Sequence, residues 1–361
     1  MKNIFDVTTT MSSFLPKQDM GGMSKISLSD IGYQTREIQD GCRDIHLDNL
    51  MSLDFVALPH LLLKNIGKTL FDEGEDAALT RWSASQLWNR YSIPVLYALK
   101  CLNKNHAELL ETNVSTWMLE DNIPAMFRLY DDLDGNTSVR GIVSEHYAKF
   151  DAPDIVKCLA KNEKLAKEFS PRSYYLDPER MHIRFVANQM MDISGEELYV
   201  GIMSDSSDVG KMAVNLRLFV LNIDSKNAII LPTGGMTYRQ VHRGKSEDGF
   251  ADDISSVINA IPTMEESVKI VIKACKDKAL KAIIDVEKDK DAALNFSKKY
   301  GFDQKTVQKA IDILSTGKYG STVWGFVNAL TEAAETLELE RRIAAEKAAG
   351  SLLFMSTQNN N

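Results

Sequence analysis

The sequence lacks the features that mark membrane-spanning, secreted and metal-binding proteins. No apolar run reaches the roughly eighteen residues that a membrane span needs, and the N-terminus has no basic segment followed by an apolar one. The four cysteines form no C-x-x-C pair, which favours reduced, mostly buried thiols over a metal site. We therefore expect a cytoplasmic protein without a membrane span or a metal. The cysteines are Cys42, Cys101, Cys158 and Cys275.

Motifs of the common catalytic sites are also missing. Ser204–Lys211 (SDSSDVGK) ends in Gly-Lys, but a phosphate loop needs a further glycine where Asp205 stands and a Ser or Thr where Met212 stands. No G-x-S-x-G or H-E-x-x-H motif occurs. His146 would offer a general base, although a half-buried structural histidine is the simpler interpretation. Enzymatic activity and a cofactor therefore have no positive support in the sequence.

The charge balance is acidic overall but uneven along the chain. The net charge is −8, of which −5 falls in residues 1–78, none in 79–245 and −3 in 246–361. The middle segment is thus more basic than its flanks, although a neutral average gives no bulk support for nucleic-acid binding. With 44% hydrophobic and 25% charged residues, the composition is that of a soluble globular protein.

The segment 198–245 predicts three successive strands of an antiparallel meander. Side chains along a strand point to alternate faces, so Met212–Ile223 should present one apolar and one mixed face. The polar segments between the strands suit hairpin connections, and Ser204–Lys211 is predicted as such a loop. The strands are Leu198–Met203, Met212–Ile223 and Ala228–Pro232, with Val214, Leu216, Leu218 and Val220 on one face and Asn215, Arg217, Phe219 and Leu221 on the other.

The chain before this meander predicts helices and a hairpin. Asp151 is a helix N-cap followed by Pro153 in the first turn, and Asp134-Gly135 is a turn signal between two strands. This mixture predicts an α+β fold. The predicted helices are Trp82–Tyr91, a second one ending at Leu102, and Ala152–Lys161; the predicted strands are Met126–Tyr130, Val139–His146, Tyr174–Leu176 and His182–Asn188.

The C-terminal part is predicted to be helical. A capping box at Thr263 and Glu266 begins one helix, Asp303 caps another, and Thr322–Ala349 is the longest candidate, ended by Gly350. This last helix packs either on its own domain or on a neighbouring subunit. We therefore predict an antiparallel meander and hairpin core with packed helices, followed by a helical region. The predicted domains are a partly ordered arm (1–78), the α+β core (79–245) and the helical region with a disordered tail (246–361).

Basic and aromatic residues are interleaved through the α+β core. Arginines on phosphates and aromatic rings on bases would together form a groove for single-stranded nucleic acid. A solvated face over an ordinary aromatic core is the competing interpretation. The candidate residues are Arg128, Arg140, Lys149, Arg184, Lys211, Arg217, Arg239, Arg243, Lys245, Tyr147, Phe219 and Tyr238.

Five segments together resemble the phage- and plasmid-borne proteins of domain-of-unknown-function family 932. At Thr233–Met236 (TGGM) the chain departs from the Cys-Asn-Gly-Met of the family pattern, so a role for that loop does not carry over. The segments are QLWNRYSIPVLY (Gln86–Tyr97), VRGIVSEHYAKFDAPDIV (Val139–Val156), LYVGIMSDSSDVGKMAV (Leu198–Val214), HRG (His242–Gly244) and STVWGFVNALTEAAE (Ser321–Glu335).

The resemblance implies a mobile-element protein acting on DNA or on its host in a bacterial cytoplasm. The order of elements is also similar to the core of phage single-strand annealing proteins of the RecT and Red-beta type. The leading hypothesis is a non-enzymatic, homo-oligomeric protein, a ring or filament, that binds and anneals single-stranded DNA in recombination or replication. A structural or interaction protein that never binds DNA is the alternative, and a nuclease or other hydrolase is third.

Overall fold

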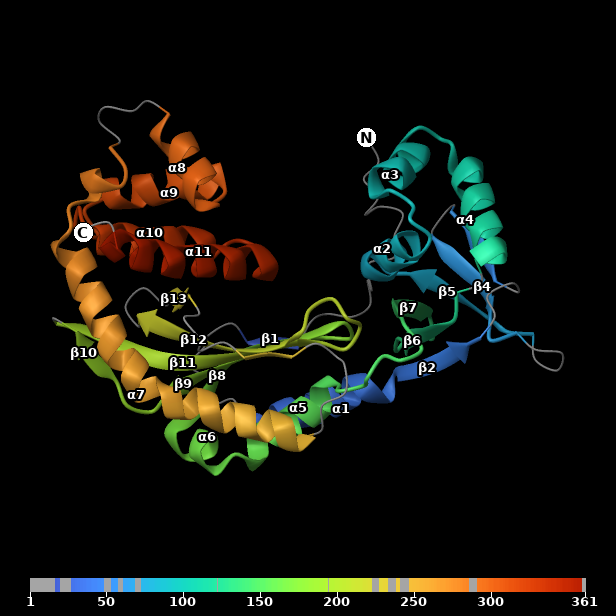
Figure 1. Ribbon diagram of the computed structural model, residues 1–361, viewed down its shortest axis with the longest axis horizontal. Helices are drawn as coiled ribbons and strands as arrows, with labels where there is room; N and C mark the ends of the chain where they lie inside the picture. Colours follow the sequence, from blue (N-terminus) through green and yellow to red (C-terminus); the bar gives the residue numbers. More distant parts are fainter. Residues whose placement is uncertain are drawn as a thin grey trace.

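The computed structural model describes residues 17–19, 27–48, 53–57, 61–68, 73–121, 123–193, 195–222, 227–232, 238–240, 247–285 and 291–358. They form two β-sheets, each with helices packed against it, so the fold is α+β as predicted (Figure 1). Each sheet carries its own large hydrophobic core.

The larger sheet has eight antiparallel strands in the order β1-β8-β9-β11-β12-β13, with β10 and β14 paired to β11 and β12. It contains the predicted meander, and the alternation predicted along β12 is confirmed by the burial of its apolar residues in the main core. The strands are β1 (Lys17–Asp19), β8 (Phe169–Asp177), β9 (Arg180–Ala187), β10 (Met191–Ile193), β11 (Glu196–Ser207), β12 (Val214–Asn222), β13 (Asn227–Ile230) and β14 (Tyr238–Gln240).

Strand β11 is longer than predicted. It continues through Ser207, so the loop prediction for Ser204–Lys211 is wrong over its first four residues. These residues pair with β9 on one side, where Asp205 lies opposite His182. A polar run of this kind is typical of a loop, and the sequence does not reveal that His182 and Arg217 on the neighbouring strands pair with Asp205.

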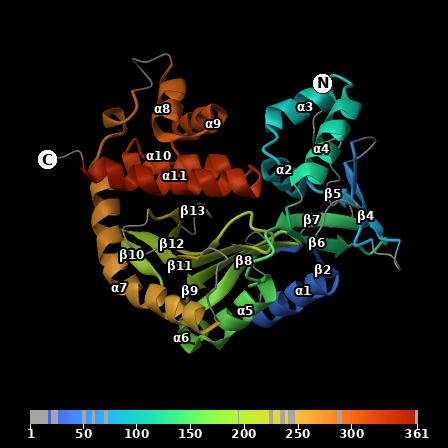
Figure 2. The ribbon, with the colours of Figure 1, turned by 45° about the vertical axis from the view of Figure 1, so that its right-hand side comes forward.

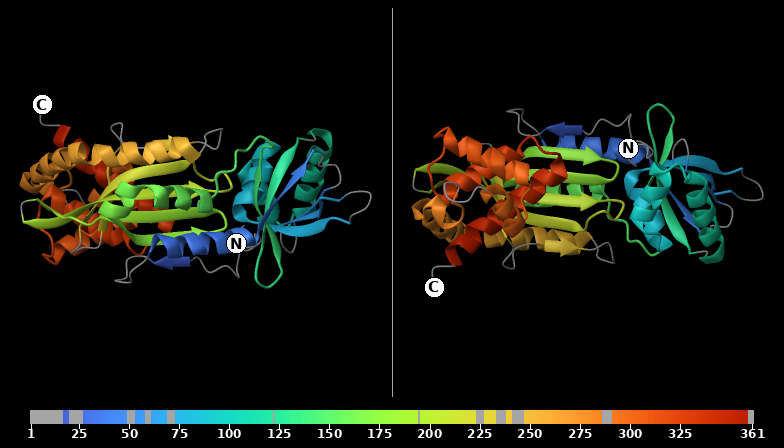
Figure 3. Two further views of the ribbon diagram at one scale, coloured as in Figure 1. Left: turned by 90° about the horizontal axis from the view of Figure 1, so that it is seen from below. Right: turned by 90° about the horizontal axis from the view of Figure 1, so that it is seen from above.

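Helices α1, α5, α6 and α7 cover the apolar face of this sheet (Figures 1 and 3). Ile183, Ile202 and Leu216 enter the same core as Ile155 and Phe250 from the helices. The helix predicted to begin at Thr263 is instead the second half of α7, which passes through Pro262 without ending. The helices are α1 (Leu28–Asp40), α5 (Ala152–Lys161), α6 (Glu163–Glu168) and α7 (Glu247–Asp277).

The C-terminal helices lie on the opposite side of the sheet (Figure 2). The single helix predicted over Thr322–Ala349 is wrong, because the chain turns at 335–338 and separates α10 from α11. Gly350 lies inside α11 and does not end it. This region packs against its own chain, since α11 contacts β13 of the larger sheet. The alternative, docking on a neighbouring subunit, stays a prediction. The elements are η2 (Leu280–Ala282), α8 (Ala292–Tyr300), α9 (Gln304–Ser315), α10 (Val323–Ala334) and α11 (Leu339–Gln358).

The smaller sheet has six strands in the order β2-β6-β7-β5-β4-β3, all antiparallel except the β5–β7 pair. The predicted hairpin is β6–β7, and the two predicted helices are α2 and α3. The sheet joins strands from both sides of the boundary predicted at residue 78. The elements are β2 (Cys42–Leu47), β3 (Asp54–Val56), β4 (Leu62–Ile66), β5 (Glu75–Leu79), β6 (Ala125–Asp131), β7 (Thr137–Val143), α2 (Arg81–Arg90), α3 (Val95–Asn103) and α4 (Ala107–Asp121).

Close contact between α11 and β13 generates a stability prediction. A Cβ added at Gly350 would clash with the carbonyl oxygen of Ile230. Alanine ordinarily stabilises a helix interior by about 1 kcal/mol relative to glycine, so a loss of stability would have to come from this contact. We expect Gly350→Ala to lower the free energy of unfolding by about 1–3 kcal/mol in urea denaturation.

Gly320→Ala is the matched control, because a Cβ at that position meets nothing within 4 Å. It should change stability by less than about 0.5 kcal/mol. A Gly350→Ala protein as stable as the wild type, or more so, would contradict the close packing of α11 on β13.

Candidate functional site

The face of the larger sheet opposite the main core, here called the polar face, carries charged residues of three adjacent strands that point the same way. A small apolar cluster of Met203, Phe219, Ala228 and Ile230 lies beside them. Asp205 on β11 lies between His182 on β9 and Asn215 on β12 in the strand register. Two positions back, Met203 lies between Arg184 and Arg217. Residues directly opposite each other on neighbouring strands share a face, so these polar side chains gather on one surface.

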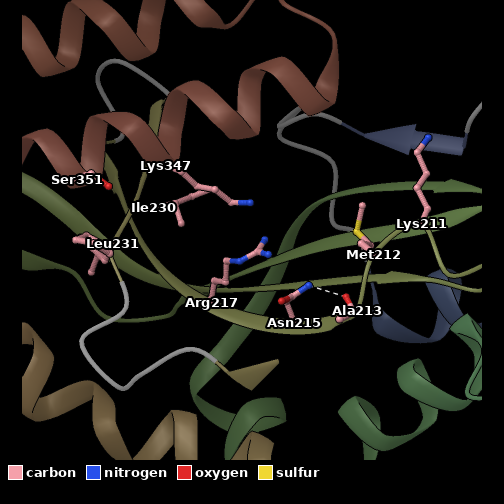
Figure 4. Close-up of a pocket in the computed structure, with 10 residues that line it drawn as sticks. Lys211, Met212, Ala213, Asn215, Arg217, Ile230, Leu231, Lys347 and Ser351 are labelled. Atoms are coloured by element: carbon pink, nitrogen blue, oxygen red, sulfur yellow. Dashed lines mark hydrogen bonds between the residues drawn. The ribbon is translucent and has the colours of Figure 1, made fainter. Parts of the chain in front are cut away.

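A groove runs between this polar face and α11, and we call it the basic groove. Its wider part has a volume of about 560 Å³ and is lined by three cations and no carboxylate among the described residues. Figure 4 shows Arg217 from β12 and Lys347 from α11 extending into the same space, with Lys211 farther along the groove. Ile230, Leu231 and Pro232 supply an apolar wall. The full lining is Lys211, Met212, Ala213, Asn215, Arg217, Ile230, Leu231, Pro232, Lys347 and Ser351.

The positive charge of the groove is only partly neutralised. Arg217 donates a hydrogen bond to Asp205, and Nζ of Lys211 lies 3.1 Å from a carboxylate oxygen of Glu340. Lys347, in contrast, has no hydrogen bond or ion pair within the described residues. Burial lowers the pKa of Lys347, and the neighbouring Arg217 guanidinium lowers it further. Two cations that repel each other in a partly buried groove favour a bound anion.

A second pocket of about 360 Å³ adjoins the first, because Lys211, Met212, Arg217 and Lys347 line both. Its floor carries the buried pair His182–Asp205, in which Nδ1 of the imidazole bonds to the carboxylate. The other ring nitrogen, Nε2, accepts a 3.2 Å hydrogen bond from Nε of Arg184.

In the observed arrangement, the His182–Asp205 pair has a structural role. Burial lowers the pKa of His182, which favours the neutral ring, and both ring nitrogens are engaged. Burial alone would raise the pKa of Asp205, but His182 and Arg217 outweigh it and the pKa is lowered. The imidazole therefore has no free lone pair to act as a general base.

Arg184 and Glu346 fasten α11 to the polar face. The buried guanidinium makes a bidentate pair with the carboxylate, at 2.5 Å from Nη2 and 3.2 Å from Nη1. Arg342 adds a 3.1 Å hydrogen bond to the same carboxylate. The Arg184 guanidinium also lies 5.8 Å from the ring centroid of Phe219, which is buried beside it. Such a paired and stacked arginine is a structural element of the core.

A second buried ion network joins the two sheets. Arg128 on β6 binds Asp44 of β2 at 2.9 Å and Asp151, the N-cap of α5, at 2.5 Å. It also donates to the backbone oxygen of Asp208, which follows β11. Arg140 on β7 donates to the Pro178 carbonyl at 2.5 Å. The network thus joins the smaller sheet to α5 and to both hairpin turns at one end of the larger sheet.

These contacts correct several sequence-based site predictions. Arg128, Arg140, Arg184 and Phe219 are buried among ion pairs and core residues, so the prediction that their side chains line a DNA groove is wrong. Strand alternation identified which residues share a face but not which face other elements cover.

The other predicted residues divide into three groups. Lys211 and Arg217 do line the groove. Lys149 is half-exposed and pairs with Asp44, while the Tyr147 hydroxyl donates to the Asp208 carbonyl, so both belong to the network between the sheets. The rest stay predictions: the side chains of Tyr238 and Arg239 and the whole of Arg243 and Lys245 lie outside the described residues.

His146, the other histidine singled out from sequence, lies in a turn after β7. Its side chain is 89% exposed, so the prediction of a half-buried strand residue is wrong. Sequence reasoning in turn missed Lys347, His182 and Asp205. The alternating sequence of β9 offered a signal for His182, since it shares a face with Arg184.

Comparison with protein families, curated proteins and solved structures finds no match to this chain. The resemblance to family 932 therefore stays a prediction. Within the described residues, no helix combines the length and apolar character needed to cross a membrane. Over the same part of the chain, no three His, Cys, Asp or Glu side chains gather where they could hold a metal ion.

Asp208 generates a pH prediction, because burial and the nearby Asp151 raise its pKa to about 7. The folded protein then holds a proton that the unfolded chain releases above about pH 4. The free energy of unfolding should therefore fall as the pH rises from about 4 to 7, by up to about 4 kcal/mol relative to Asp208→Asn, and then level off. Urea denaturation at a series of pH values measures this difference. Parallel stability curves for the two proteins from pH 4 to 8 would contradict the raised pKa.

Proposed function

We propose that this protein binds single-stranded DNA, with the phosphate backbone in the basic groove. The observation that supports this most directly is the lining of the groove, where Lys211, Arg217 and Lys347 gather. Lys211 and Arg217 are paired with Glu340 and Asp205, whereas Lys347 has no partner among the described residues. Lysine and arginine side chains that neutralise phosphates supply most of the affinity of proteins that bind nucleic acid without sequence preference. A phosphate between Arg217 and Lys347 would also relieve their mutual repulsion.

The composition of the groove favours backbone contacts over base contacts. Its described lining contains no aromatic side chain on which a base would stack, and the buried ring of Phe219 does not serve this purpose. Asn215 and Ser351 provide neutral hydrogen-bonding groups beside the cations. The proposal is therefore sequence-independent binding, in which affinity depends strongly on salt.

The arrangement gives less support to the other two hypotheses. A hydrolase would need a free base or a metal, and the imidazole of His182 has both nitrogens engaged. No feature of the groove specifically favours the hypothesis of a structural or interaction protein that never binds DNA. Annealing, assembly into a ring or filament, and action in recombination or replication of a phage or plasmid rest on the family resemblance, and we propose them only as its consequences.

The salt dependence of binding tests the groove. Lys211→Gln and Lys347→Gln should each weaken binding of a labelled oligonucleotide severalfold in fluorescence anisotropy at about 50 mM salt. Each should also reduce the slope of log K against log salt by about 0.7, because the variant neutralises one phosphate fewer on the single strand. Both side chains are partly exposed, so the fold should tolerate the changes.

Lys164→Gln with Lys167→Gln is the matched control. These two lysines line a different pocket, near Pro262, together with Glu168 and Glu265. The control protein should keep the wild-type affinity and slope. Absence of wild-type binding at about 50 mM salt, or equal slopes for all these proteins, would overturn the proposal.

A further inference from the structure

Helices α8 and α9 form a compact unit that the basic groove does not use. Three residues join them, and Gly301 adopts the left-handed conformation (φ 78°) that ends α8. Asp303 then caps α9 by accepting a hydrogen bond from the Thr306 backbone N–H. A three-residue turn that contains glycine is typical of helix-turn-helix motifs.

The unit has its own apolar contacts, which hold α9 in place. The rings of Phe296 on α8 and Phe326 on α10 meet edge to face with centroids 5.1 Å apart. Phe302 from the turn and Val307 from α9 are buried with them. The three helices α8, α9 and α10 therefore pack together, as the supporting and recognition helices of such motifs do.

The outward side of this unit is polar and carries surplus lysine. Gln304, Lys305 and Gln308 are exposed along the N-terminal half of α9. Lys298 and Lys299 are exposed at the end of α8, next to the turn. Figures 1 and 2 show α8 and α9 beyond α10 and α11, on the side away from the larger sheet. Nothing in the described part of the chain covers these five side chains.

The local charge favours a polyanionic partner. Residues 291–318 hold five lysines and three aspartates in a chain whose net charge is −8. One of the aspartates, Asp303, is occupied as the N-cap of α9, and Asp312 accepts a hydrogen bond from Gln308. Lys309 turns back toward Thr336 and Lys318 pairs with Glu332 of α10, so neither is among the lysines available to a partner.

We propose that the α8–α9 unit is a second nucleic-acid site, which binds duplex DNA with α9 in the major groove. Gln304 and Lys305, near the N-terminus of α9, would face base edges, where glutamine pairs with adenine and lysine with guanine. Lys298 and Lys299 would contact the phosphate backbone. The site is independent of the basic groove and does not require that groove to bind anything.

The test uses the full chain and a labelled duplex of random sequence. The triple variant Lys298→Gln, Lys299→Gln, Lys305→Gln should bind the duplex at least tenfold more weakly at about 50 mM salt, with a salt slope smaller by about 0.9 for each phosphate that is no longer neutralised. The same variant should keep the wild-type affinity for single-stranded DNA. A variant with the same number of exposed lysines replaced elsewhere should bind the duplex as the wild type does; its positions are Lys104, Lys273 and Lys281.

The outcomes separate this site from the basic groove. Selective loss of duplex binding in the triple variant, with Lys211→Gln and Lys347→Gln unaffected on duplex, supports the proposal. A wild-type protein that does not bind duplex, or a triple variant that binds it normally, overturns the proposal. Joint loss of both binding activities in the triple variant also overturns it, since one shared site would then serve both nucleic acids. Circular dichroism checks that each variant is folded.

Discussion

The buried ion pair between Arg184 and Glu346 fixes where α11 lies on the larger sheet, and the arrangement of the basic groove depends on it. Arg184 lies near the middle of the larger sheet, on the face that the main core does not use. A guanidinium buried without a partner would be strongly destabilising, and removal of one partner from a buried pair commonly costs about 3–5 kcal/mol. Glu346 meets this requirement only if α11 returns across the sheet.

Several features of the chain are explained by the path of α11 back across the larger sheet. The turn at 335–338 separates α10 from α11 and lets α11 reverse direction, and Gly350 allows it to approach the backbone of β13. The residue after Glu346 is Lys347, which α11 then places opposite Arg217. The contact that neutralises Arg184 thus places Lys347 opposite Arg217, which is itself paired with Asp205, in the basic groove. Glu346, which holds α11 on the sheet, and Lys347, which lines the groove, are thus adjacent in the sequence.

A second buried arginine, Arg128, also needs charged partners, and these partners join the two sheets. Arg128 is fully buried, and its partners come from β2, from the N-terminus of α5 and from the end of β11. The two hydrophobic cores are separate clusters, and this buried ion network joins the sheets that carry them. Buried ion pairs add little net stability compared with apolar packing, so we assign this network a role in fixing how the sheets are oriented.

Strand and helix patterns along the chain predicted much of the fold. The alternation in β12 and the N-cap Asp151 followed by proline both placed their elements correctly. Local sequence patterns gave wrong bounds where tertiary contacts determine the ends of a helix or strand. The capping box at Thr263 competes with the packing of a continuous α7, and Asp205 at the polar end of β11 is paired with residues on other strands. The candidate site was harder to predict than the fold. A list of arginines cannot distinguish a cation paired in the core, such as Arg140, from one that lines a groove, such as Arg217, because the distinction depends on which carboxylates come from distant elements.

Cross-linking tests the central claim most directly, because it locates the nucleic acid on the protein. A photoreactive single-stranded oligonucleotide, bound at about 50 mM salt and irradiated, is followed by mass spectrometry of the cross-linked peptides. The account predicts adducts in peptides that contain Lys211–Arg217 and Ile343–Ser351, the two sides of the basic groove. Adducts confined to other surfaces, such as the outer side of α7, would contradict it.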